Sequence, residues 1–489
     1  MLYIKGHHTY LKEIAHRVMK ERGLLPAFNA NDMQELAEIQ GSAGMPDKTV
    51  RDMRRRIWCS IDNDNSRDLD QLTYAEALPD GNVKIYVALA DVDALVKPNT
   101  ALDKHAHHNT CTVYTAAEIF PMLPERLSTN LTSLGFGADR LALVVEMQVN
   151  KDGAIIGFNI YRAMVRNYAK LSYRNLAEWL DGKAGMPHAL SLVKELDKNL
   201  RLQDAVAQKM KLLRHKRGAL EFETIHASPV FEGEVLTNLV QDRSNRAKDI
   251  VSDFMIAANG VVASYLKKQN YPSLRRVVKT PARWDRIVEL AAERGTKLPQ
   301  VPDARALNEF LTAEKAADPL RFPDLSLSVI KLLGGGEYTI EQPGGDEEGH
   351  FGLAVKDYTH STAPNRRYPD LITHRLVKAA LKGLPLPYET DELAALAKHC
   401  TATEDIVKKV ERQVNKSAAA LLLHTRIGEE FDAIITGASP KGTWARLLHL
   451  PVEGRLMDGN EGLDIGYKIR VKLVSTDVEK GFIDLKRVV

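Results

Sequence analysis

The stretch Ser60-Ile61-Asp62-Asn63-Asp64-Asn65-Ser66-Arg67-Asp68-Leu69-Asp70-Gln71-Leu72 places four carboxylates within nine residues. Its first two residues end the apolar run IWCSI, and the remainder shows neither helical nor alternating apolar spacing. Such crowding costs mutual repulsion unless a cation neutralises it. Oxygen ligands suit hard ions such as Mg²⁺ and Mn²⁺. The segment therefore predicts a metal site that follows a strand.

Two other interpretations of the acidic segment remain open. Asp62, Asp64 and Ser66 occupy the first three ligand positions of an EF-hand loop, but Arg67 stands at the position of the turn glycine and Thr73 at that of the bidentate glutamate. The second alternative is a solvated loop whose Asp and Asn side chains cap turns. The acidic segment alone does not distinguish these interpretations, so the other parts of the sequence are needed.

The surrounding sequence alternates between strand-like and helical patterns. From 56 to 165 it is typical of strands, with IWCSI (57–61), KIYVALADV (84–92) and LALVVEMQV (141–149), broken by turns at Asp80-Gly81 and Asp152-Gly153. Helical spacing follows over 190–217 up to Gly218, 246–268, 283–294, 304–316, 369–382 up to Gly383, and 391–425. These patterns predict a mixed α/β body.

Both ends of the chain differ from this body. Residues 1–50 predict a small helical domain, in which Asn31 and Gln34 resemble a capping box. It is either a winged or plain helix-turn-helix that binds nucleic acid, or a packing or docking domain. From Ile427, short strands with regular turns predict an all-β barrel of the oligonucleotide-binding type. The expected domains are 1–50, 51–426 and 427–489.

Composition excludes several classes of protein. The 67 Lys and Arg nearly balance the 64 Asp and Glu, so a nucleic acid would have to be bound by local clusters. Cys59, Cys111 and Cys400 are odd in number and widely spaced, which fits a reducing cytoplasm better than disulfide pairing. No apolar run of about 20 residues and no signal peptide is evident, so we expect no membrane partner.

Two basic clusters favour a nucleic-acid substrate. One comprises Arg51, Arg54, Arg55 and Arg56, and the other comprises Lys209, Lys211, Arg214, Lys216 and Arg217. Each alone is more often a solvated helix face. Together with a carboxylate-metal centre they match phosphodiester hydrolysis, which uses cations to hold phosphates and metal ions to stabilise the attacking and leaving oxygens.

Ordered blocks of sequence give a resemblance to a known family. IDNDNSRDLDQL (61–72) resembles the signature segment of the ribonuclease II and ribonuclease R (RNB) exoribonucleases. The similarity continues in register through TVYTAAEIFPMLPERLST (112–129), RGALEFET (217–224), FMIAAN (254–259), YTHSTAPNRRYPDLITHRL (358–376), VERQV (410–414) and IGEEFDAIITG (427–437). The resemblance runs from about residue 56 to the C-terminus and implies an RNB-like catalytic domain followed by an S1-type barrel.

The resemblance assigns roles within the acidic segment. The metal-binding carboxylates of the family correspond to Asp62, Asp68 and Asp70, which would bind one or two Mg²⁺ or Mn²⁺ ions for catalysis. The fourth position, usually Asp in the family, is Gln71 here. An amide oxygen can coordinate a cation but adds no negative charge. We therefore expect weaker binding of one metal ion or a changed metal preference.

The catalytic arginine of the family corresponds to Arg366, where a guanidinium could bind the oxygens of the scissile phosphate. Arg367 is the adjacent alternative, and pairing with an acid is the alternative structural role. The motif departs from the family pattern at Ser361, Ala363 and Asn365.

The resemblance also implies RNA-binding residues. Tyr114 matches the aromatic residue that stacks on the 3′-terminal base, and Phe222 matches its probable partner on the other face. Glu411 aligns with a family glutamate, although Glu404, Lys408 and Glu411 share one helix face and could form solvated ion pairs. Asp253, or else Ser252, falls at the acidic position that contacts the ribose 2′-hydroxyl.

Taken together, the expected function is 3′-to-5′ hydrolysis of single-stranded RNA to 5′ nucleoside monophosphates by a monomer. The alternative is an RNA-binding protein whose catalysis is weakened by Gln71. A DNA-binding regulator that acts through the N-terminal helices would involve only a small part of the chain. Members of the family commonly begin with two cold-shock-type barrels, whereas about 50 helical residues precede the catalytic region here.

Overall fold

The computed structural model describes residues 6–45, 47–224, 226–242, 244–345, 349–439, 442–459, 461–463 and 466–488. The helices are α1 (His7–Glu21), α2 (Ala30–Glu38), α3 (Ala101–Asn109), α4 (Tyr173–Leu180), α5 (His188–Ser191), α6 (Leu196–Lys216), α7 (Arg246–Lys268), α8 (Trp284–Ala292), α9 (Ala304–Ala317), α10 (Phe322–Leu333), α11 (Tyr368–Lys382) and α12 (Thr390–His424). The strands are β1 (Arg51–Asp52), β2 (Trp58–Asp62), β3 (Gln71–Ala77), β4 (Val83–Ala90), β5 (Val113–Tyr114), β6 (Ile119–Phe120), β7 (Asp139–Val149), β8 (Ile155–Ser172), β9 (His226–Glu232), β10 (Val235–Asp242), β11 (Ser273–Val277), β12 (Glu337–Glu341), β13 (Glu430–Ser439), β14 (Gly442–Leu447), β15 (Glu453–Asp458), β16 (Lys468–Asp477) and β17 (Phe482–Val488). The predicted mixed α/β fold with N-terminal helices and a C-terminal barrel is confirmed.

A six-stranded sheet in the order β1-β8-β2-β3-β4-β7 forms the centre of the body. The long strand β8 pairs antiparallel with β7 along most of its length and parallel with β2 near its end, so the strand pairings run in a ring. The parallel pairing places Asp62 opposite Ser172. The first carboxylate of the acidic segment therefore lies where β2 and β8 end together.

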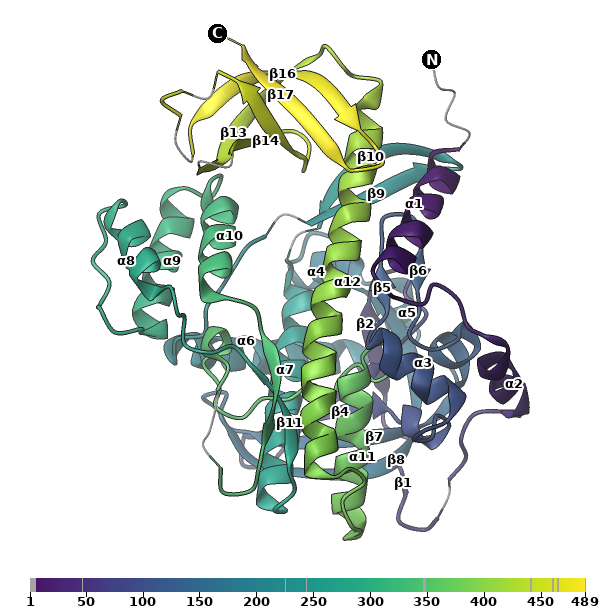
Figure 1. Ribbon diagram of the computed structural model, residues 1–489. Helices are drawn as coiled ribbons and strands as arrows, with labels where there is room; N and C mark the ends of the chain where they lie inside the picture. Colours follow the sequence, from purple (N-terminus) through teal and green to yellow (C-terminus); the bar gives the residue numbers. More distant parts are fainter. Residues whose placement is uncertain are drawn as a thin grey trace.

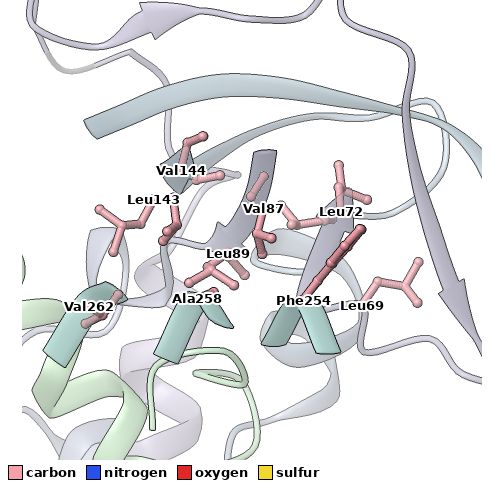
Figure 2. Close-up of a cluster of buried hydrophobic side chains, with 14 of the residues drawn as sticks. Leu69, Leu72, Val87, Leu89, Leu143, Val144, Phe254, Ala258 and Val262 are labelled. Carbon is pink, nitrogen blue, oxygen red and sulfur yellow. The ribbon is translucent and has the colours of Figure 1, made fainter. Parts of the chain in front are cut away.

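Helix α7 covers one face of this sheet. Phe254, Ala258 and Val262 recur every four residues and lie against Leu72 and Leu143 of the strands (Figure 2). Within the described residues, α7 is the one helix whose length and apolar composition would allow it to cross a membrane, which corrects the expectation that no such run exists. Its burial against the sheet is that of a core helix.

The predicted helix ends at Gly218 and Gly383 are confirmed. Gly218 follows the last turn of α6 with φ +98°, and Gly383 follows α11 with φ +60°. These are left-handed conformations that glycine adopts without steric cost. The single helix predicted over 190–217 is divided into α5 and α6, with Glu195 at φ +67° before α6.

The two N-terminal helices pack on different parts of the molecule. Helix α1 packs against α12 and β10, whereas α2 packs against α3 (Figure 1). The cap of α2 is Asn29, which forms a capping box with Asp32, so the predicted pair Asn31 and Gln34 is wrong by two positions. The domain boundaries predicted at residues 50 and 426 remain predictions.

Strands β13-β14-β15-β17-β16 close into a barrel that sits at one end of α12 (Figure 1). Helix α12 is 35 residues long, and the hydrophobic core beneath the barrel includes residues of α1 and α12. A separate core holds α8, α9 and α10, which lie between β11 and β12 in the chain. Arg446 of the barrel pairs with Asp324 of α10 at 2.8 Å, which ties these two units together.

Candidate active site

The acidic segment and the arginine motif meet at Asp70. Asp70 is 2% exposed and precedes β3 directly. Its Oδ1 accepts a hydrogen bond from the main-chain N–H of Asn365 at 2.9 Å, and its Oδ2 accepts one from Nε of Arg366 at 3.2 Å. Burial raises the pKa of Asp70 to about 7, although the charge of Arg366 and the N–H of Asn365 act in the opposite direction. A buried carboxylate with this pKa is a candidate functional group.

Arg366 remains open to a ligand. Its side chain is 42% exposed although it contacts Asp70, and Asp70 raises the pKa of Arg366 against the effect of burial. A guanidinium has five N–H donors, and the contact with Asp70 uses one of them. Arg366 can therefore bind a second anion while it stays paired with Asp70.

Tyr114 contacts the acidic segment from strand β5. Its hydroxyl donates a hydrogen bond to Oδ2 of Asp68 at 3.2 Å, and its main-chain N–H donates one to Oε1 of Glu411 at 2.9 Å. The side chain is 40% exposed, so its ring can stack on a ligand. Burial raises the pKa of Glu411, and the N–H of Tyr114 opposes that effect. The structure thus brings Tyr114, Asp68 and Glu411 into one group.

Asp62 completes the acidic segment at the end of β2. Its Oδ1 accepts the main-chain N–H of Asn63 at 2.7 Å. Burial raises the pKa of Asp62, and the nearby charge of Asp68 raises it further. A cation at this place would lower the pKa of both Asp62 and Asp70 by favouring their charged forms.

A cavity of about 180 Å³ lies on one side of Arg366 and Tyr114, and its lining does not include Asp62, Asp68 or Asp70. Tyr114, Arg366, Arg367 and Glu411 line it, together with Tyr338. Four of the residues predicted to act on RNA therefore face one space, although they come from β5, the segment just before α11, and α12.

Gln71 ties the acidic segment to the arginine motif. Its side-chain amide nitrogen donates a hydrogen bond to the main-chain oxygen of Thr362. The amide oxygen of Gln71 is the group that could coordinate a cation, and an aspartate could not make the same contact because it has no N–H to donate. Gln71 thus has a structural contact that no pattern in the sequence predicted.

Arg367 has a different role from Arg366. Its Nη2 donates a hydrogen bond to Oδ1 of Asp370 at 2.8 Å, and Asp370 is fully buried. Asp370 also accepts the main-chain N–H of Ala363 at 2.8 Å, so the pair shapes the turn that carries the motif. The structural role considered above for Arg366 was pairing with an acid near the start of the helix. In the structure it is chiefly Arg367 that has this role.

Two predicted RNA-binding residues lie elsewhere. Phe222 packs against the core of α8, α9 and α10, and in the described part of the chain it makes no ring contact with Tyr114. Asp253 pairs with Arg214 of α6 at 2.5 Å and lines a different cavity. The structure therefore does not bring Phe222 and Asp253 together with Asp70.

The basic clusters also lie apart from the cavity of Tyr114 and Arg366. Arg54 pairs with Asp52 and Asp139, and Arg51 stacks on the ring of Tyr161 at 3.7 Å. Neither cluster lines this cavity, and the role of the clusters in holding phosphates stays a prediction.

The carboxylate oxygens of the acidic segment suit a hard divalent cation. In this structure, however, the carboxylates are not arranged around one common point. Over the described ranges, no three His, Cys, Asp or Glu side chains are placed to hold a metal ion together. Asp68 is directed to Tyr114, and Asp70 is held by Asn365 and Arg366. Asp62, Asp68 and Asp70 are the residues that would bind the ion, with the amide oxygen of Gln71 as a fourth donor.

The residues that hold the arginine motif in place could not be identified from the sequence. Oδ1 of Asn259 on α7 accepts hydrogen bonds from the main-chain N–H and the hydroxyl of Ser361, both at 2.8 Å. Nε2 of His374 donates to the oxygen of Ser361 at 2.7 Å. Asn259 and His374 both fall inside family-like blocks, but the sequence alone did not show which members of a block touch each other.

Comparison with known families assigns most of the chain. The RNB domain matches residues 50–383, and the RNase II-type exonuclease C-terminal S1 domain matches residues 429–488. Because the first match covers more than half of the chain, the chain belongs to the family of proteins with an RNB domain.

Individual relatives agree with this assignment. Ribonuclease R of Vibrio cholerae is 31% identical over 430 residues, which are 82% of this chain and 50% of that protein. Ribonuclease R of Escherichia coli K12 is 31% identical over 421 residues, again 82% of this chain and 50% of the relative. The chain therefore spans about half the length of the curated relatives it matches.

Solved structures share the fold. RNase R of Mycoplasma genitalium, in complex with ribose methylated single-stranded RNA, is similar with a TM-score of 0.87 at 23% identity, over 98% of this chain and 78% of that one. Yeast Ssd1, described as a pseudonuclease, gives a TM-score of 0.73 at 14% identity, over 94% of this chain and 57% of that one. At these identities the likeness shows the fold alone.

Proposed function

We propose that this chain is a 3′-to-5′ hydrolytic exoribonuclease that degrades single-stranded RNA as a monomer in the cytoplasm. The contact between Arg366 and the buried carboxylate of Asp70, beside the exposed ring of Tyr114, carries the proposal. The names of the relatives, Ribonuclease R, support RNA as the substrate.

Each residue of the site would have a separate task. Tyr114 would stack on the terminal base, which any of the four bases allows. Arg366 would bind the non-bridging oxygens of the scissile phosphate and stabilise the charge that builds up there. Glu411 would position Tyr114 by accepting a hydrogen bond from the main-chain N–H of Tyr114. Water adds to phosphorus while the bond to the 3′ oxygen breaks, so each step releases one 5′ nucleoside monophosphate and leaves a 3′-hydroxyl.

Exoribonucleases of the RNB family depend on divalent metal ions in general. We propose Mg²⁺ or Mn²⁺ for this chain, as one or two ions held by Asp62, Asp68 and Asp70. When bound, the metal supplies a nucleophile at neutral pH and neutralises developing charge. Through their contact, Arg366 and Asp70 would hold the phosphate and the acidic segment close to the metal.

A second candidate function is RNA binding with weakened catalysis. The observation that favours it is Gln71 itself, because this residue adds no negative charge at the position where the family usually has Asp. A protein of this kind would hold RNA ends through Tyr114 and Arg366 without cleaving them efficiently.

Cleavage of end-labelled single-stranded RNA distinguishes the two functions. The wild-type chain with Mg²⁺ or Mn²⁺ should shorten the RNA from its 3′ end and release 5′ nucleoside monophosphates, whereas Asp70→Asn should leave the RNA intact. Asp70→Asn retains an oxygen that can accept the N–H of Asn365, so its fold should persist. Equal amounts of intact RNA with both proteins, together with tight RNA binding, would support the second function.

A further inference from the structure

A second and larger cavity lies against another face of α7. Its volume is about 640 Å³, and Asp253, Ala257, Gly260 and Ser264 of α7 line it. These residues recur every three or four positions and so form one face of the helix. Asn259 faces elsewhere, toward Ser361 of the arginine motif. The cavity is therefore separate from the candidate active site but shares a helix with it.

One wall of this cavity is apolar and accessible. Ile155, Ile156 and Phe158 at the start of β8 line the cavity and are 36%, 55% and 38% exposed. The small residues Ala257 and Gly260 stand on α7 and leave room in front of it. An apolar wall with accessible side chains favours a ligand with a flat, apolar part.

The charged residues of the cavity leave an excess of positive charge. Asp253 pairs with Arg214, and Asp357 pairs with Arg275 at 3.1 Å and accepts the hydroxyl of Ser264 at 3.2 Å. Both carboxylates are thus compensated by cations. Arg217 and Lys268 also line the cavity, and within the described residues neither side chain has a hydrogen-bond or ion-pair partner. Two cations are therefore available for an anionic ligand.

We propose that this cavity is a second ligand site, which binds a 5′ mononucleotide. The base would lie against Ile156 and Phe158, and Arg217 and Lys268 would attract the phosphate. A cavity of about 640 Å³ is within the usual range for sites that bind small molecules. The choice of a nucleotide rests on the proposed function, which produces nucleotides of this class, whereas the charge and the apolar wall do not depend on it.

Calorimetric titration of the full chain with AMP tests the proposal. The Asp70→Asn protein without divalent metal serves as the host, so that a failure of the proposed nuclease activity does not affect the result. We expect AMP to bind, and the double variant Arg217→Gln/Lys268→Gln to lower its affinity about tenfold, the free-energy scale of one charge-assisted contact. The control Lys209→Gln/Lys216→Gln removes the same charge from exposed positions outside the cavity and should bind AMP normally.

A second variant and two further probes complete the test. Ile156→Ser/Phe158→Ser should weaken AMP and adenosine but leave inorganic phosphate unchanged, and it decides the question if the first variant does not fold. No binding of AMP at millimolar concentration would overturn the proposal. Binding that is lost in Tyr114→Ala or Arg366→Ala and retained in both cavity variants would also overturn it, because the nucleotide would then occupy the candidate active site.

Discussion

The side-chain amide nitrogen of Gln71 donates a hydrogen bond to the main-chain oxygen of Thr362. This contact joins the strand that follows Asp70 to the segment that carries Arg366. The pairing of Asp70 with Arg366 is the second link between the same two segments. The residue that departs from the family pattern in charge is therefore a structural connection at the centre of the site.

Substitutions of Gln71 separate this connection from metal binding. Gln71→Ala and Gln71→Asp both remove the donated hydrogen bond, so each should lower the free energy of unfolding by about 1 kcal/mol. Only Gln71→Asp adds a negative charge beside Asp70, which strengthens the attraction for a cation. We expect the Mg²⁺ concentration for half-maximal RNA cleavage to be lower in Gln71→Asp than in Gln71→Ala. Equal metal requirements would contradict a role for this position in metal binding.

The adjacent arginines should respond differently to removal. Arg366→Ala should lower kcat by about 100-fold to 1000-fold, the usual effect of losing one stabilising donor in the transition state. It should destabilise the fold less than Arg367→Ala does, because burial already raises the pKa of Asp70 to about 7 and this carboxyl can take up a proton when its cation is removed. Arg367→Ala leaves the buried carboxylate of Asp370 without its partner and should cost about 3 kcal/mol of stability. Single-turnover cleavage and thermal unfolding measure the two effects. A stable but inactive Arg367→Ala would reverse the roles assigned to these residues.

Variants of Tyr114 test stacking apart from hydrogen bonding. Tyr114→Ala should weaken the binding of single-stranded RNA by about 1 to 3 kcal/mol, the range for loss of one stacked base. Tyr114→Phe keeps the ring and loses only the hydrogen bond to Asp68, so its effect should be smaller. Fluorescence anisotropy in the Asp70→Asn background provides the measurement. If the two variants bind RNA equally weakly, the hydroxyl and not the ring makes the important contact.

A buried ionic network should dominate the acid sensitivity of the body. Asp91 is buried between Arg162 and Lys378, with which it forms contacts of 2.9 Å and 2.8 Å. Burial raises the pKa of Asp91, but the charges of Lys378 and Arg162 outweigh that effect and hold the pKa below its ordinary value of 3.8. Asp91→Asn should therefore cost about 3 kcal/mol of stability at neutral pH.

The pH dependence of this variant follows from the lowered pKa. Near and below pH 3.8 the unfolded chain binds a proton at Asp91 before the folded chain does, so the contribution of Asp91 is lost as the pH falls through this range. The stability difference between the wild-type chain and Asp91→Asn should be constant from pH 5 to 8 and should shrink toward pH 3. Urea unfolding at each pH provides the test, and a difference that grows as the pH falls would contradict the assigned direction.

Local signals in the sequence predicted many of the elements that position the site. Helical spacing closely predicted α7 and α12, and glycines marked the ends of α6 and α11, because these features depend on neighbouring residues. The double pairing of β8 with β7 and β2 had no such signal, since it joins strands far apart in the chain. Helix α10 was also missed.

The site itself was predictable in part. Asp70, Arg366, Tyr114 and Glu411 come together as the ordered blocks implied. Phe222 and Asp253 do not join them, because the direction of a side chain depends on how its segment is rotated against its neighbours. The contacts of Asn365 with Asp70 and of Gln71 with Thr362 could not be foreseen, since they join segments almost 300 residues apart.

Helix α12 has a mechanical consequence for the site. It extends without interruption over 35 residues, which is about 50 Å at 1.5 Å per residue, and it packs against β16 and β17 of the barrel. Glu411 lies on this helix and holds the main chain of Tyr114. A tilt of the barrel about the far end of α12 would therefore displace the Glu411 carboxylate, and the aromatic ring would move with it. The position of the barrel and the position of Tyr114 are therefore coupled through α12.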